Sequence, residues 1–230
     1  LGSLCPVTRA HVLMFEEARK LLLDAARLKR LDMQPFAACV GFISLNGDYH
    51  VADKLRASGD RPLSKQDRFA LIDLATADKA WLHTCRGPVP SSVLDLRRRW
   101  PGLTFCHFVM NGADDVVKYR KWDKKSRCPG ERFITMGRRE SMEDLAKGMR
   151  KSRVEEDEFF ILGPVLPDIS STQARAASKR GDRATLREMV HDDVADWLLK
   201  WDGHAAGASV SLPAGRAGPA EEDIDYWDWE

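Results

Sequence analysis

Two short segments of this chain carry residue types that bind phosphate groups. In the first, Gly2 and Ser3 form a candidate turn, and Thr8 and His11 follow it directly. Thr8 is a suitable N-cap, because apolar residues with helical spacing follow at positions 12, 15, 18, 22 and 25. A helix N-terminus has unpaired N–H groups and a partial positive charge, so it attracts anions. His11 would then face whatever the turn of Gly2 and Ser3 holds.

The second segment surrounds the start of a helix near the other end of the chain. Ser170 or Ser171 would cap a helix that ends near Gly181, where a glycine suits the C-terminal stop. Arg175 lies one turn inside this helix. A fixed guanidinium can donate two parallel hydrogen bonds to one phosphate. The second segment is therefore a further candidate phosphate site.

Each segment alone also has an ordinary structural explanation. The first could be a glycine turn with a histidine that helps to cap a helix, and the second a capped surface helix with a solvated arginine. The pair is more specific than either half. Two phosphate sites suggest two phosphorylated substrates, so the pair favours a nucleotide-transfer enzyme.

The composition favours an intracellular globular protein. Thirty-six basic residues stand against 35 acidic residues, a net charge of +1, so no general affinity for nucleic acid or an anionic membrane is expected. We find no apolar run long enough to span a bilayer and no signal-peptide pattern. The five cysteines lack a Cys-x-x-Cys pair, which favours reduced thiols and no protein-bound metal. We expect the cytoplasm or the nucleus; the oligomeric state stays open, a homo-oligomer included.

Strand and helix patterns alternate along the chain. This alternation predicts an α/β fold: a Rossmann-like, mostly parallel sheet with helices on both faces, in a single domain over residues 1–202 with a small helical part at its C-terminal end. In such a fold the first phosphate turn follows a strand, so a strand is expected before Leu1. The strands are expected at 36–44, 80–84, 103–110, 132–136 and 158–162. The later helices are expected at 64–75, 140–151, 170–179 and 192–201, and residues 93–100 are expected to be the end of a basic helix.

The last segment, residues 203–230, differs in composition from the rest. It is rich in glycine, alanine, serine and proline and ends in acidic residues with three aromatic residues among them. This composition is typical of a flexible acidic tail. The aromatic residues could also dock on a basic surface, of this chain or of a partner.

The order of the motifs resembles that in the eukaryotic-type nicotinamide/nicotinate mononucleotide adenylyltransferases of the nucleotidylyltransferase superfamily. That family begins with Gly-Ser-Phe-Asn-Pro-x-Thr-x-x-His and has Ile-Ser-Ser-Thr-x-x-Arg late in the chain; this chain reads Gly-Ser-Leu-Cys-Pro-Val-Thr-Arg-Ala-His and Ile-Ser-Ser-Thr-Gln-Ala-Arg. The similarity extends from Gly2 to about Lys200. Between the two motifs, the matching segments are Ile43–Tyr49, Asp67-Arg68, Trp81, Gly112–Asp114, Trp122 and Gly137-Arg138.

The resemblance implies that the phosphate of a pyridine mononucleotide attacks the α-phosphorus of ATP and releases pyrophosphate. Such a reaction depends on positioning and on stabilisation of phosphate charge. Mg²⁺ would bridge the phosphates, held mainly by substrate and water. By the same resemblance, His11, Arg175 and Thr8 are catalytic. ATP would be bound by Gly2, Ser3, Leu4, His11, Gly112, Asp114, Ser171, Thr172 and Arg175. The acceptor would be bound by Ser44, Lys54, Trp122 and Arg138.

The sequence departs from the family most clearly on the acceptor side. A Trp-Glu pair, whose tryptophan stacks on the pyridine ring, is usual a few residues beyond Trp81, but this chain reads His83–Gly87 there. Trp122 could supply one stacking face, and Arg86 could meet a nicotinate carboxylate. Asp114 could be a helix cap instead of a ribose ligand.

Two alternative functions stay open: another phosphorylated acceptor in the same fold, and a non-catalytic nucleotide-binding or interaction protein. A redox Rossmann enzyme is disfavoured, because the chain has no Gly-x-Gly-x-x-Gly after a first strand.

Overall fold

A computed structural model of the protein describes residues 2–87, 89–123 and 132–201 and confirms the α/β class. The described residues group by their contacts into two compact units. Unit 1 draws on the chain up to Val12, on Phe42–Asp95 and on the chain from Ile169 onward. Unit 2 is formed by Leu13–Gly41 and Leu96–Asp168. The domain expected over residues 1–202 thus contains two compact units, and the segment 203–230 lies outside the described residues.

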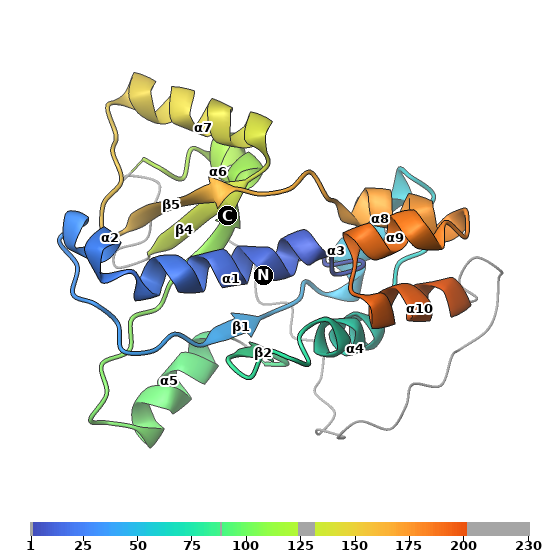
Figure 1. Ribbon diagram of the computed structural model, residues 1–230, viewed down its shortest axis with the longest axis horizontal. Helices are drawn as coiled ribbons and strands as arrows, with labels where there is room; N and C mark the ends of the chain where they lie inside the picture. Colours follow the sequence, from blue (N-terminus) through green and yellow to red (C-terminus); the bar gives the residue numbers. More distant parts are fainter. Residues whose placement is uncertain (1, 88, 124–131, 202–230) are drawn as a thin grey trace. The chain divides into compact units, whose positions relative to one another are not determined.

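Helices and strands alternate along the described chain (Figure 1). The helices α1 and α5 each have residues in both units. The elements in chain order are α1 (Arg9–Leu23), α2 (Ala25–Arg30), β1 (Gly41–Ile43), α3 (Asp48–Arg56), α4 (Lys65–Ala75), β2 (Leu82–Thr84), α5 (Val89–Arg99), β3 (Val109–Gly112), α6 (Ala113–Tyr119), β4 (Phe133–Gly137), α7 (Arg139–Ser152), β5 (Phe160–Val165), α8 (Ser171–Lys179), α9 (Arg183–Met189) and α10 (Asp192–Lys200).

Unit 2 is built on a three-stranded parallel sheet in the order β3-β4-β5. Side chains of a strand alternate between its two faces. Ile134 and Met136 of β4 join a buried apolar cluster with Leu22 of α1 and Leu28 of α2. Phe133 of β4 instead joins a second cluster, together with residues of α6 and α7. Helices therefore cover both faces of this parallel sheet, as the sequence predicts.

Unit 1 has a smaller sheet and a group of packed helices. Strands β1 and β2 pair with each other, and Gly2 forms a parallel bridge with Leu45, just beyond β1. Helix α10 packs against α4, α8 and α9. Ser178 of α8 donates a hydrogen bond to the carbonyl of Leu198 in α10 at 3.3 Å, so these two helices are also joined by a polar contact.

Two predicted strands are largely wrong. Of the segment 36–44, only residues 41–43 form a strand, and of the segment 103–110, only the last two residues do. Phe36 and Phe108 still pack against the core of unit 2 and meet edge to face, with ring centroids 5.8 Å apart. Val40 and Leu103 are exposed. An apolar run can thus supply core side chains from irregular chain, without strand hydrogen bonds.

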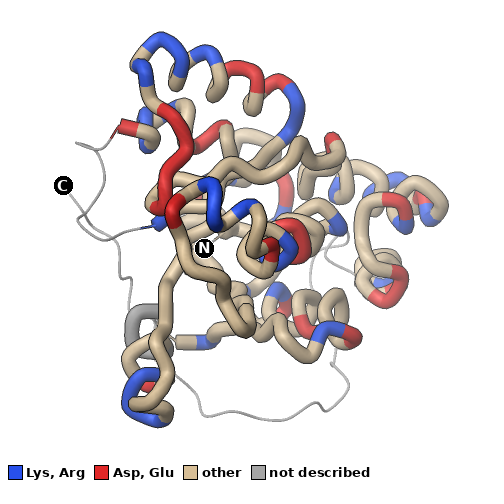
Figure 2. Tube along the Cα trace, turned by 60° about the vertical axis from the view of Figure 1, so that its left-hand side comes forward, with Lys and Arg blue, Asp and Glu red and all other residues tan. Residues whose placement is uncertain are grey.

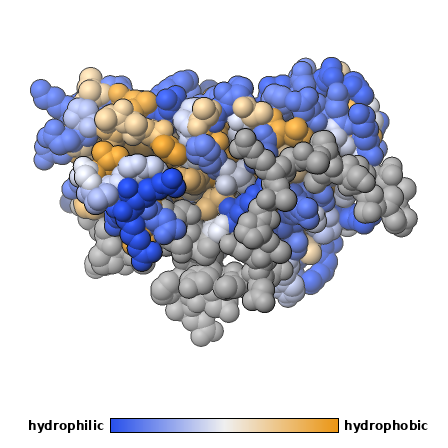
Figure 3. All heavy atoms as spheres, turned by 90° about the horizontal axis from the view of Figure 1, so that it is seen from below, coloured by the Kyte–Doolittle hydropathy of each residue, from blue (hydrophilic) through white to orange (hydrophobic). Residues whose placement is uncertain are grey.

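Charged residues are distributed over the helices without separating by sign. Stretches of Lys and Arg and stretches of Asp and Glu both occur at several places along the tube in Figure 2, in agreement with the near-zero net charge. The face seen in Figure 3 shows hydrophobic residues among hydrophilic ones. Among the described residues, no helix combines the length and the apolar character that crossing a bilayer requires.

Candidate functional site

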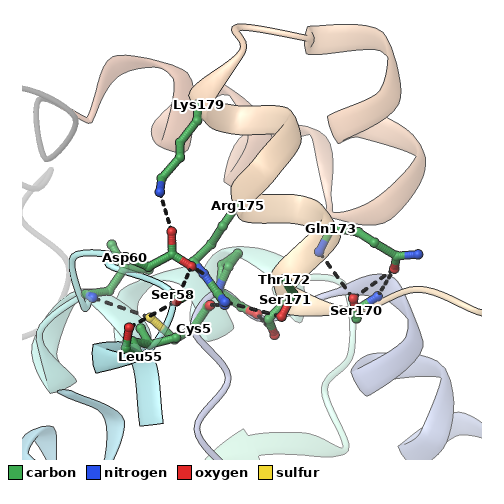
Figure 4. A network of polar contacts seen from close by, with 12 residues as sticks. Cys5, Leu55, Ser58, Asp60, Ser170, Ser171, Thr172, Gln173, Arg175 and Lys179 are labelled. Atoms are coloured by element: carbon green, nitrogen blue, oxygen red, sulfur yellow. Dashed lines mark hydrogen bonds and ion pairs between the residues drawn. The ribbon is translucent and has the colours of Figure 1, made fainter. Parts of the chain in front are cut away.

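The structure brings the two candidate phosphate segments together within unit 1. The hydroxyl of Ser171 donates a hydrogen bond to the carbonyl of Pro6 at 2.8 Å, although 165 residues separate them. Nη1 of Arg175 donates to the carbonyl of Cys5, also at 2.8 Å (Figure 4). The start of helix α8 is thus attached to the turn that precedes helix α1. Two segments that lie far apart in the sequence therefore form one candidate site.

Helix α8 begins as its sequence predicts. Ser170 is the N-cap: its hydroxyl accepts the N–H of Gln173, and the side chain of Gln173 accepts the N–H of Ser170 at 2.7 Å. This reciprocal capping box satisfies two N–H groups at the helix start. The cap therefore fixes the first turn of α8, which carries Ser171 and Thr172 and leads directly to Arg175.

His11 is held in one hydrogen-bonding state by Thr8. The backbone N–H of Thr8 donates to Nδ1 of His11 at 3.0 Å, and the Thr8 hydroxyl lies 2.7 Å from the same nitrogen. Because a backbone N–H can only donate, Nδ1 must be the acceptor and Nε2 must carry the proton. The imidazole can therefore donate a hydrogen bond through Nε2, as an anionic ligand requires.

The surroundings of His11 keep its ring uncharged. Burial, assisted by the positive charge of Lys54, lowers the pKa of His11 from 6.5 to about 4. Lys54 lies on α3, and its side chain is exposed. The structure thus places two predicted site residues, His11 and Lys54, within electrostatic reach of each other. At neutral pH the positive charge here belongs to Lys54, and His11 is a neutral donor.

The turn between Gly2 and Pro6 has an unusual backbone. Leu4 has φ +40°, in the region that residues with a side chain rarely adopt. The backbone N–H of Gly2 donates to the carbonyl of Ser44 at 3.2 Å. Ser44, which is predicted to bind the acceptor substrate, therefore lies beside this turn.

The Cys5 side chain is buried, and burial raises the pKa of its thiol. Cys5 is therefore a packing residue here rather than a thiolate nucleophile.

Arg175 is fixed by contacts on all three of its nitrogens. Besides the bond from Nη1 to Cys5, Nε donates to a carboxylate oxygen of Asp60 at 2.8 Å, and Nη2 donates to the hydroxyl of Thr172 at 3.2 Å (Figure 4). Lys179, one turn further along α8, contacts the other oxygen of Asp60. Burial alone would raise the pKa of the Asp60 carboxyl, but the hydrogen bonds from Lys179 and Arg175 outweigh burial and lower it to about 2. Asp60 is thus a carboxylate at any working pH.

Four predicted site residues belong to unit 2. Gly112 is the N-cap of α6, and Asp114, in the first turn of α6, is exposed. Arg138 precedes α7 and forms an ion pair with Asp168 at 3.2 Å. Trp122 is 4% exposed in the apolar core, and its indole N–H donates to Ser152 at 3.2 Å. A stacking role for Trp122 would require a ring face that this packing covers.

Arg86 is occupied by partners in unit 1. Its guanidinium forms an ion pair with Asp73 at 2.9 Å and lies over the ring of Phe69, 4.8 Å from the centroid. Its side chain remains half exposed. In this position Arg86 is a neighbour of α4, and its role toward a nicotinate carboxylate stays a prediction.

Three charged residues of the site are absent from the sequence-based prediction: Asp60, Lys179 and Arg68. Arg68 is fully buried and donates to the carbonyl of Ser3 at 3.0 Å and to Asp48 at 2.8 Å. Its sequence signal is detectable, because Arg68 occupies the apolar stripe of α4 with residues 71, 72 and 75. A charge in such a stripe needs a specific partner. Asp60 follows Gly59 in a connecting segment and has no comparable pattern.

The chain matches no model of a known protein family and no curated protein sequence. Within the described ranges, no three His, Cys, Asp or Glu side chains are grouped as the ligands of a metal ion would be. The candidate site is therefore defined by its own geometry: a neutral histidine donor, an exposed lysine, a capped helix start and an anchored arginine.

Proposed function

We propose that this chain is an adenylyltransferase that transfers AMP from ATP to nicotinamide or nicotinate mononucleotide. A phosphate oxygen of the mononucleotide attacks the α-phosphorus of ATP, the bond from that phosphorus to the β-phosphate oxygen breaks, and pyrophosphate leaves. The products are NAD or its deamido form and pyrophosphate. The main support is the junction of the two phosphate segments through Ser171–Pro6 and Arg175–Cys5.

The chemistry of each residue suits this reaction. His11 donates from Nε2 to an oxygen of the α-phosphate, where charge increases as the new bond forms. Arg175, Thr172 and the N-terminus of α8 bind the β- and γ-phosphates and then the pyrophosphate. Lys54 adds a positive charge near His11. Neither a covalent intermediate nor a general base is needed, since the attacking phosphate is already ionised at neutral pH.

Magnesium would accompany ATP in this proposal. Mg²⁺ commonly keeps several waters and binds through substrate phosphates rather than through a cage of protein ligands. The site residues are mainly hydrogen-bond donors, which suit phosphate oxygens rather than a cation. We therefore assign the ion to the nucleotide, where it would neutralise phosphate charge.

The acceptor assignment rests on the sequence resemblance and on Ser44, which lies beside the turn at Gly2. Either pyridine mononucleotide fits the proposal. The partners are therefore ATP and one such mononucleotide, and the site lies in a protein expected in the cytoplasm or nucleus.

The test is pyrophosphate release from Mg-ATP by the purified protein, with nicotinamide or nicotinate mononucleotide as acceptor. Turnover should require an acceptor and should fall by about 10²-fold or more in His11→Ala, since this change removes a donor to the transition state. Asp196→Asn is the control, because the Asp196 carboxylate of α10 accepts hydrogen bonds from Arg183 and Arg187 of α9, residues to which the proposal gives no role. If ATP binds but neither acceptor supports turnover, the chain is not this enzyme and serves another acceptor or none.

A further inference from the structure

Asp60 lies at the candidate site and also lines a pocket to which no ligand group has yet been assigned. A pocket of about 360 Å³ in unit 1 lies next to Arg175 and Lys179. Its charged lining is Arg61, Arg175, Lys179 and Asp60, and its apolar lining includes Leu63 and Trp201. Three cations against one carboxylate make the pocket suitable for an anion. The Asp60 carboxylate itself is 8% exposed and bonded to two of the three cations.

A long arginine side chain loses conformational freedom when it binds a ligand, and prior fixation reduces that loss. Nε of Arg175 is fixed by Asp60, Nη1 by the carbonyl of Cys5 and Nη2 by Thr172. A guanidinium has five N–H groups, so these bonds leave one on each terminal nitrogen for a further acceptor. These three hydrogen bonds therefore fix the plane of the guanidinium in which Arg175 can donate to a phosphate.

We propose that Asp60 is a positioning residue that holds Arg175 and Lys179 to receive the terminal phosphates of ATP in the adjoining pocket. This inference rests on the proposed function, because ATP is taken as the ligand. Asp60 does not touch the nucleotide in this account. It acts through the two cations, one turn apart on α8, whose side chains it draws together (Figure 4).

The charge of Asp60 makes the proposal distinguishable from a purely electrostatic role. Removing a carboxylate raises the positive potential of the site, and this effect alone would tighten the binding of an anion such as ATP. Loss of the positioning of Arg175 and Lys179 would instead weaken the binding of ATP. In Asp60→Asn we therefore expect Mg-ATP to bind about tenfold more weakly, which corresponds to the loss of one charge-assisted hydrogen bond from Arg175 or Lys179 to the phosphates. The KM of the mononucleotide should stay unchanged.

The experiment is a double-variant cycle on Mg-ATP binding, measured by calorimetry with the full chain. It uses the wild type, Asp60→Asn, Arg175→Ala and the combination of the two changes. Because Asp60 holds both Arg175 and Lys179, Asp60→Asn should weaken Mg-ATP binding clearly less once Arg175 is absent than it does in the wild type, and the remaining effect belongs to Lys179. If Asp60→Asn instead caused a general loss of structure, it would weaken the binding of Mg-ATP by the same factor whether or not Arg175 is present. That result would overturn the inference.

Asp196→Asn is the matched control, because Asp196 also joins two cations of unit 1, Arg183 and Arg187. It should leave Mg-ATP binding unchanged. If Asp60→Asn does not fold, Lys179→Met tests whether the cations held by Asp60 bind the phosphates, because the Lys179 side chain is half exposed. This variant should weaken the binding of Mg-ATP and leave the KM of the mononucleotide unchanged. Unchanged or tighter ATP binding in Asp60→Asn would overturn the role of Asp60 but not the proposed function. Failure of the wild type to bind Mg-ATP would overturn both.

Discussion

At the scale of single residues, the property that matters most is the neutral state of His11. Thr8 occupies Nδ1 through its backbone N–H, and this fixes the proton on Nε2. Burial and the charge of Lys54 both disfavour the imidazolium. A neutral ring can donate a hydrogen bond without the large desolvation penalty of a buried charge. The residue is thus prepared for a ligand that brings its own negative charge.

We expect His11 to titrate in the ligand-free protein with a pKa of about 4, well below 6.5. Lys54→Met should raise this pKa, because it removes a nearby positive charge. Bound pyrophosphate should also raise it, because an anion favours the imidazolium. Histidine ring resonances followed by NMR between pH 3 and pH 8 measure all three effects, with His11→Gln to assign the signal. A pKa of about 6.5 in the wild type would contradict the site geometry.

The same pKa has a consequence for stability. The folded-state pKa of His11 is lowered relative to the unfolded value of 6.5, so the unfolded chain binds more protons between pH 6.5 and about pH 4. Stability should therefore fall as the pH is lowered through this window, by up to about 3 kcal/mol from this group alone. Comparison of the urea unfolding of wild type and His11→Gln across this window isolates that contribution.

At the scale of elements, helix starts and strand ends position the side chains. Helix α8 depends on a capping box, and α4 begins at Ser64, whose hydroxyl accepts the N–H of Asp67 at 3.0 Å. In unit 2, strand β4 ends at Gly137, where α6 comes close. A Cβ at position 137 would lie 2.9 Å from Cβ of Ala113 and 3.2 Å from its backbone nitrogen. Only a glycine allows this approach of helix to strand.

We therefore expect Gly137→Ala to destabilise the protein by about 1–3 kcal/mol through overpacking against backbone that cannot move aside. Gly102→Ala is the matched control, because a Cβ there would meet no atom within 4 Å. Its effect should stay within about 0.5 kcal/mol. Urea unfolding monitored by circular dichroism gives both values. Equal stability of the two variants would show that the contact at Ala113 is not rigid.

Local signals explain which elements the sequence could predict. The helix starts at Ser64 and Ser170 were predictable, because a cap and its partner lie three residues apart. The strand at 103–110 was not, because an apolar run does not reveal whether its backbone pairs with a neighbour. Helix α3 was missed entirely. Its nine residues include four charged ones, with buried Val51 and Leu55 alone marking an inner face.

At the scale of the whole chain, the candidate site depends on contacts between distant segments. The sequence predicted both phosphate segments, but not the partners that hold them together. The bonds from Arg175 to Asp60 and to Cys5 span 115 and 170 residues, and no periodicity encodes such a contact. Contacts of this separation form late and at a high entropic cost. The site should therefore exist only when the first and last described stretches of unit 1 have both folded.

The most direct test of the account is calorimetric binding of Mg-ATP to the wild type, His11→Ala, Arg175→Ala and Asp196→Asn. We predict binding of one ATP per chain, weakened about tenfold or more by Arg175→Ala and also reduced by His11→Ala, and unchanged in Asp196→Asn. That result would mean that the two segments form one nucleotide site. Binding that responds to neither His11 nor Arg175, or no binding at all, would contradict the account at its centre.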